Sequence, residues 1–205
     1  MKKICAFFTF LFLMNVAFLS CKKADSNNGI SSSFYFTAVI DGTTVTYEDG
    51  KNGYGSGVGS SSGTVPAGCQ KEQSLNLRAY VTKNSAGVSI LKTFDQCSVD
   101  CSLIEGMFYV GTYTYGKRSL STNQNGIDGA AVYYVDNNGT LWSSGYGTAT
   151  QTGSNFKITE HIENTKDYFS NKITKATFNC TLYDGNGNSK TLTNGEIRSR
   201  SVVCI

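Results

Sequence analysis

The sequence predicts an all-β fold, an antiparallel β-sandwich or barrel of about ten short strands. Many short segments alternate apolar with polar residues, and glycine or asparagine marks the turns between them. No stretch after the apolar N-terminal run repeats with the period of an amphipathic helix. Pro66 is the only proline of the 205 residues, so glycine and asparagine have to supply most of the turns.

Each expected strand is marked by its own alternation or by β-branched and aromatic residues, and the turn from Asp41-Gly42 has the sequence of a tight hairpin. In chain order the predicted strands are residues 34–40, 45–48, 74–82, 88–94, 107–116, 129–135, 140–148, 155–162, 173–183 and a last strand that follows the turn at 184–188 and ends near residue 203.

Residues 50–63 do not fit this pattern. The segment is rich in glycine and serine, and it contains neither GxxxxGK[ST] nor a complete GxGxxG, so it has no phosphate-binding signature. We expect a surface loop here.

The N-terminus has the parts of a bacterial export signal. Lys2 and Lys3 precede an apolar run that ends at Ser20, which favours a cleaved signal peptide over residues 1–20. Residues 18–21, Phe-Leu-Ser-Cys, resemble a lipobox with phenylalanine in place of the usual leucine, so we expect Cys21 to carry a diacylglycerol and further acyl chains such as palmitate. An ordinary secretory signal and an uncleaved anchor remain as alternatives.

This signal sets the expected domain organisation and location. Residues 21–33 would be the lipidated cysteine and a flexible tether, and residues 34–205 a single β-sandwich or barrel domain. The membrane partner is the bilayer that holds the lipid anchor. We expect the protein to be located in the bacterial cell envelope, at the outer membrane. Both the periplasmic face and the cell surface remain as alternatives.

Charge argues against one class of partner. Without residues 1–20 the chain keeps 16 basic and 15 acidic side chains, because Lys2 and Lys3 leave with the signal. A near-neutral domain is a poor ligand for nucleic acid, which requires clustered lysine and arginine.

Four segments together resemble a known family. Residues 34–42 (FYFTAVIDG), 111–116, 131–153 and 157–197 are similar to small Bacteroidetes-type lipoproteins, in which a strand ending in DG opens the domain and a TNGEF-like run closes it. Ile197 stands where the family has an aromatic residue. The resemblance implies the fold and the location only, because the family brings no established activity.

Cysteine chemistry follows from the expected location. With Cys5 cleaved away and Cys21 acylated, an odd number of cysteines is left in a compartment that permits disulfides, so we expect one or two bridges and at least one thiol. The remaining cysteines are Cys69, Cys97, Cys101, Cys180 and Cys204.

The preferred bridge joins Cys69 to Cys97 or to Cys101, from loops that could approach. In a straight hairpin centred on Asn186, Cys180 faces Leu192, which disfavours a bridge to Cys204. Cys180 shares its strand face with apolar residues. A buried, unpaired thiol therefore explains it at least as well as a disulfide does.

No residue is assigned a catalytic role, and neither a cofactor nor a metal is expected. Cys97 and Cys101 form a CxxxC without the second ligand pair of a zinc site or the CxxC of a redox site. His161, the only histidine, falls on the solvent side of its predicted strand, while Glu160 shares the apolar face and would be a structural ion pair if it met Arg198 or Arg200. Residues 184–188 resemble the start of a calcium loop, but the later ligand positions differ, which favours a plain hairpin turn.

Aromatic residues give the one indication of binding. Tyrosines and the only tryptophan gather between residues 109 and 146, and exposed rings stack on sugars or anchor partner proteins, although packing in the core or at a strand edge is the more common role of such residues. The candidate aromatic binding face is Tyr133, Tyr134, Trp142 and Tyr146.

Two classes of function remain. The first is a cell-envelope binding module for a glycan, peptide or protein. The second is a structural or assembly accessory of an outer-membrane complex that recognises its partner through a strand edge. A hydrolase is a distant third, without a motif to support it.

Overall fold

The computed structural model describes residues 32–79, 84–118, 126–147, 151–164 and 172–201. The described residues belong to one compact unit, Ser31–Ile205. The predicted signal peptide, Cys21, nearly all of the tether and Cys204 lie outside the described residues.

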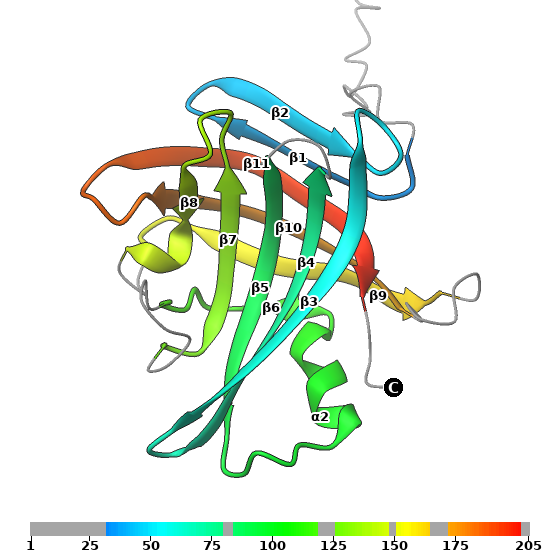
Figure 1. Cartoon of the computed structure of the whole chain (residues 1–205), viewed down its shortest axis with the longest axis vertical. Coiled ribbons are helices and arrows are strands. Elements are labelled where there is room, and N and C mark those ends of the chain that lie inside the picture. Colours follow the sequence, from blue (N-terminus) through cyan, green and yellow to red (C-terminus); the bar gives the residue numbers. More distant parts are fainter. Residues whose placement is uncertain (1–31, 80–83, 119–125, 148–150, 165–171, 202–205) are drawn as a thin grey trace, which may run out of the picture. The chain divides into compact units, whose positions relative to one another are not determined.

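The all-β prediction is confirmed. The described residues form one antiparallel sheet of eleven strands that curls into a half-barrel, in place of two stacked sheets (Figure 1). None of the helices in the described ranges is both long and apolar enough to cross a membrane. The strands are β1 (Tyr35–Ile40), β2 (Thr43–Glu48), β3 (Tyr54–Val65), β4 (Gly68–Ala79), β5 (Ser85–Phe94), β6 (Gly111–Thr112), β7 (Gly129–Val135), β8 (Leu141–Ser143), β9 (Asn155–Glu163), β10 (Lys172–Tyr183) and β11 (Ser189–Ser201).

The order across the sheet is β2-β1-β11-β10-β8-β7-β5-β4-β3, with β9 paired to β10 and to β6. The helical segments are α2 (Cys101–Glu105) and the 3₁₀ helices η1 (Gly106–Phe108) and η2 (Ser144–Tyr146). Two predicted strands are therefore shorter than expected. The stretch 107–116 keeps only β6, and 140–148 keeps only β8 before it turns into η2.

Side-chain alternation gives the sheet two unlike faces. The inner face holds the core, where the centroid of the Phe178 ring lies 5.9 Å from that of Phe36 and 5.9 Å from that of Phe156. The outer face of β3, β4 and β5 carries mainly glycine, serine and other small or polar residues. Burial of the aromatic inner face is what stabilises the curl.

The curl brings the end of β11 against the start of β3. The Ser56 hydroxyl lies 2.7 Å from the Ser199 hydroxyl and accepts a hydrogen bond from the Arg200 N–H. The Arg200 guanidinium also pairs with the Asp49 carboxylate at 3.3 Å. These contacts join two strands that lie far apart in the order of the sheet.

The expectation of a loop over residues 50–63 is wrong. Residues from Tyr54 onward form β3, which pairs with β4 over twelve residues in unbroken register. Glycine leaves room for the side chains of β4, since a Cβ on Gly59 would lie 2.5 Å from the Ser74 hydroxyl, and one on Gly57 would lie 2.9 Å from the Asn76 side chain. The partner strand, not the propensity of the segment itself, makes this a strand.

The expectation of an exposed His161 is also wrong. Between the pairs Ile158 to Ala176 and Glu160 to Lys175, β9 has a bulge at Thr159 that shifts the register. The bulge turns the His161 side chain inward, where it is 6 % exposed, and leaves Ile162 outside at 48 %. It also places Glu160 against Arg198 at 2.8 Å, the structural ion pair that the sequence allowed.

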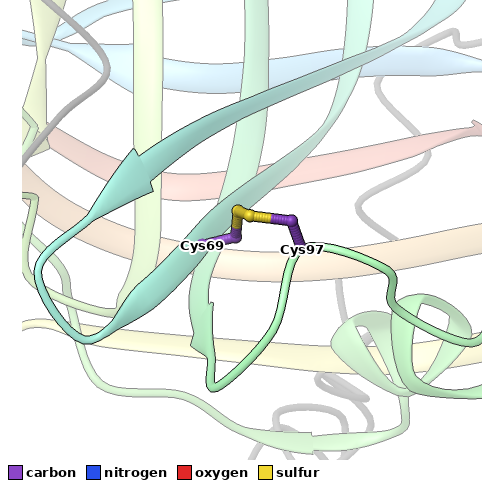
Figure 2. Close-up of a disulfide and its surroundings, with 2 residues drawn as sticks. All are labelled: Cys69 and Cys97. Carbon is purple, nitrogen blue, oxygen red and sulfur yellow. A yellow bond between two sulfur atoms is a disulfide. The ribbon is translucent and has the colours of Figure 1, made fainter.

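The disulfide joins Cys69 to Cys97, one of the two predicted pairings (Figure 2). Cys69 is the second residue of β4 and is buried, so it does not lie in a loop as expected. Cys97 does lie in a loop, which follows β5. Cys101 begins α2, outside the disulfide. Cys180 is a buried thiol directly opposite Leu192, as the hairpin geometry predicted.

The predicted hairpin turn over residues 184–188 is confirmed. It joins β10 to β11, and the Asp184 carboxylate accepts hydrogen bonds from the backbone N–H groups of Asn186 and Asn188 and from the Asn188 side-chain amide. Asp184 is thus a turn-forming residue.

Loss of the disulfide should destabilise the domain. The bridge closes a sequence separation of 28 residues, for which chain entropy gives about 3–4 kcal/mol. Replacing Cys69 and Cys97 together by alanine should lower the free energy of unfolding by about this amount in urea titrations, whereas the exposed Cys101→Ser should change it far less. Equal stability of the double variant and the parent would contradict the assignment.

Candidate functional site

A groove of about 400 Å³ runs over the outer face of β3, β4, β5, β7 and β8. We call it the serine groove, because hydroxyl groups line much of it and two tyrosines flank them. The lining serines are Ser60, Ser61, Ser74, Ser85, Ser89 and Ser143.

Strand register explains the flat floor of the serine groove. Gly59, Ser74, Ser89 and Ala131 are consecutive direct partners across four strands, so a glycine and three small side chains lie side by side on one face. Larger residues at these positions would fill the groove.

Tyr133 lies across the sheet at the rim of this floor. Its direct partner is Gly87, where a Cβ would come within 2.5 Å of the Tyr133 hydroxyl, so glycine leaves the room that the ring occupies. Burial raises the pKa of Tyr133 well above its ordinary value, and its hydroxyl interacts with Asn76 and Ser74. The side chain is a fixed neutral ring with a hydrogen-bonding tip.

Tyr146 forms the other flank, at the end of η2. Burial, and secondly the Glu72 carboxylate, raise the pKa of Tyr146. Ser143 positions η2, because its hydroxyl accepts a hydrogen bond from the Gly145 N–H at the start of the helix.

Glu72 and Arg118 form an ion pair within the serine groove. The Arg118 Nε donates to the Glu72 Oε1 at 2.9 Å, and the Arg118 Nη2 donates to the Ser89 hydroxyl and to the Gly129 carbonyl. Arg118 is the only cationic side chain among the described lining residues, and its donors are largely used within the protein. The serine groove therefore offers hydroxyls, tyrosine rings and one paired carboxylate.

The four residues of the candidate aromatic face do not share a surface. Tyr133 and Tyr146 line the serine groove, whereas Tyr134 and Trp142 are direct partners on the inner face and are each 8 % exposed. The reason is strand alternation, since Tyr133 and Tyr134 are neighbours and must point to opposite sides.

Trp142 is held from both sides as a core residue. Its Nε1 donates to the Asp136 carboxylate at 3.0 Å, and the Lys190 ammonium lies 4.5 Å from the centre of a ring. Hydrogen bonds from Trp142 and from the backbone of Thr140 and Asn138 outweigh burial and lower the pKa of Asp136.

His161 belongs to a separate buried cluster. Its Nδ1 lies 2.8 Å from the Thr174 hydroxyl, and its Nε2 lies 3.7 Å from the Glu105 carboxylate, which also binds the Lys172 ammonium at 2.8 Å. Thr174 and Ser201, the hydroxyls of this cluster, are fully buried and cannot reach a substrate. The arrangement fastens α2 to the sheet.

Across the described ranges, no group of three or more histidine, cysteine, aspartate or glutamate side chains is placed to hold a metal ion. Comparisons with protein-family models, curated proteins and solved structures give no match. The resemblance to small Bacteroidetes-type lipoproteins thus stays a prediction, and the functional argument rests on the serine groove.

Sequence reasoning missed the floor of the serine groove and the pair of Glu72 with Arg118. A signal for the floor was present, since Gly55, Gly57 and Gly59 recur at every second position, the period of a strand. The ion pair joins two residues that are far apart in the chain, so no local sequence pattern could predict it.

Stability should fall in mild acid because of His161. Burial, the largest cause, lowers the pKa of His161 below its ordinary value of 6.5, so the folded state binds the proton less readily than the unfolded chain. The stabilisation is complete above about pH 6.5, the unfolded value, and is lost as the pH falls through the folded pKa. The urea midpoint should drop between pH 7.5 and 5.5, and His161→Gln should reduce this drop; an unchanged drop would show that other groups cause it.

Proposed function

We propose that this protein is a lipid-anchored binding module of the bacterial cell envelope, and that the serine groove binds a neutral carbohydrate. The observation that carries the proposal is that Tyr133 and Tyr146 line the same groove as six serines. A volume of about 400 Å³ lies within the range of small-ligand sites, about 300–1,000 Å³.

The chemistry of the serine groove fits a neutral sugar better than an anion. Tyrosine rings offer apolar faces to the C–H faces of a pyranose, and their hydroxyls, like those of serine, both donate and accept hydrogen bonds. Arg118 already neutralises Glu72, so an anion finds no uncommitted cation among the described lining residues. An anionic ligand would also meet the Glu72 carboxylate.

The same features argue for recognition without rearrangement. Gly87 lets the Tyr133 ring lie against the sheet, and the Arg118 side chain is held to Glu72 of β4 and to Ser89 of β5 by hydrogen bonds. A ligand that enters a preformed site loses less affinity to the ordering of side chains.

The envelope location is supported by the sequence of residues 1–21, which lies outside the described residues. The positive start, the apolar run and Ser20-Cys21 are the parts that export and lipidation use. A tethered domain with an outward groove suits the capture of a glycan near the membrane.

Removal of the Tyr133 ring should weaken sugar binding without unfolding the domain. Tyr133→Ala should weaken binding to neutral glycans by about tenfold or more, on an array and by calorimetry, because one stacking surface is lost. Tyr109→Ala is the matched control, since Tyr109 is a tyrosine 53 % exposed outside the groove. Trp142→Ala should instead cost about 3–5 kcal/mol of stability, as expected for a large core truncation. Equal binding by Tyr133→Ala and the parent would refute the groove as the site.

Cys21→Ala should release the protein from the membrane. Without the thiol the diacylglycerol has no point of attachment, so the anchor cannot form. In bacteria fed a palmitate analogue, the parent should be labelled and should sediment with membranes, and the variant should do neither. Labelling of the variant would contradict the proposed anchor.

A further inference from the structure

The edge of β3 presents backbone groups that no described strand uses. β3 is the last strand of the sheet on its side and pairs with β4 along its whole length (Figure 1). The Ser56 N–H points away from β4, because it donates to the Asp49 carboxylate at 2.8 Å. By the alternation of an antiparallel ladder, the N–H and C=O groups that point the same way belong to Val58, Ser60, Ser62 and Thr64.

Contacts with the rest of the domain cover only the start of this edge. Ser56 is bonded to Asp49, Ser199 and the Arg200 N–H, but within the described residues no backbone group pairs with the outward amides beyond it. The four residues with outward amides are all exposed. About two-thirds of β3 is therefore an open strand edge.

Nothing in β3 protects this edge. Exposed edges are commonly guarded by lysine, proline or a bulge. β3 has the sequence YGSGVGSSSGTV, without a charge or a proline, and its register with β4 shows no shift. Such an edge accepts an added strand readily.

Two lysines next to the edge indicate the charge of the added strand. Ser62, Lys71 and Lys92 are successive direct partners on one face of the sheet. Like charges placed directly opposite each other are destabilising, and neither lysine forms an ion pair with a described residue, although Lys92 lies 5.6 Å from the centre of the Phe94 ring. A side chain directly opposite Ser62 on an added strand would lie on the same face as the two lysines, because direct partners share a face. The small Ser62 side chain leaves room between that side chain and Lys71.

We propose that the open edge of β3 binds an extended, acidic segment of a partner protein, which joins the sheet as a further strand. Backbone hydrogen bonds to Val58, Ser60, Ser62 and Thr64 hold the segment, and Lys71 and Lys92 select its acidic side chains. A second copy of this chain fits less well, because β3 has no acidic side chain that an added β3 strand could present to Lys71.

The test uses a fluorescent nine-residue peptide in which glutamate alternates with threonine or valine, and fluorescence anisotropy with the purified chain. Ser62→Pro, which removes one outward N–H that has no described acceptor, should weaken binding by about tenfold or more, and Ser62→Ala, which keeps the N–H, should not. Lys71→Glu should weaken binding of the glutamate peptide and leave a glutamine version unaffected. Tyr133→Ala should bind the peptide as the parent does, which separates this site from the serine groove.

A second measurement leaves the protein unchanged, in case Ser62→Pro does not fold. Two peptides, each methylated on alternate backbone amides, differ only in which edge of the peptide is blocked. Strand addition predicts that one of them binds and the other does not. Equal binding by both peptides would overturn the proposal, as would a concentration-dependent dimer that Ser62→Pro abolishes while the glutamate peptide fails to bind.

Discussion

The closure of the curled sheet at Ser56 is the constraint on which the rest of the structure depends. This single sheet buries its aromatic inner face by curling until distant strands meet, and β3 meets β11 where Ser56 touches Ser199 and the Arg200 N–H. Ser199 is fully buried, so its hydroxyl needs this partner. Near this contact the Tyr54 ring of β3 stacks on Tyr47 of β2, with centroids 4.3 Å apart.

Closure also separates the two faces of the sheet into two roles. Large side chains fill the inner face, and the outer face of β3, β4 and β5 is left with residues too small to fill it. Gly87 on the outer face lets Tyr133 lie flat, while its neighbours Ala86 and Val88 point into the core. The serine groove is thus a consequence of the same alternation that builds the core. The open edge of β3 follows from the same geometry, because closure covers that strand only at Ser56.

The sequence predicts the elements whose signal is local. The hairpin of β10 and β11, with Cys180 opposite Leu192, follows from alternation and a turn sequence, and the candidates for the disulfide follow from the few cysteines outside the predicted core. The predictions are wrong where pairing with a neighbouring strand determines the local structure. β3 has the composition of a loop and becomes a strand through β4, and the bulge at Thr159 reverses the faces of His161 and Ile162. The alternation of side chains along a strand predicts that Tyr133 and Tyr134 point to opposite sides of the sheet. It does not predict which of them faces the core, because that depends on the direction in which the sheet curls.

The central claim is that the outer face, and not the interior of the half-barrel, is the ligand-binding surface. Amide chemical shifts of the labelled protein, followed while a neutral trisaccharide is added, test it most directly. The account predicts saturable shifts concentrated at Gly59, Ser89, Ala131 and Gly145, around the floor of the serine groove. Shifts confined to inner-face positions such as Leu77 and Trp142, or the absence of saturable shifts with any neutral sugar, would contradict it.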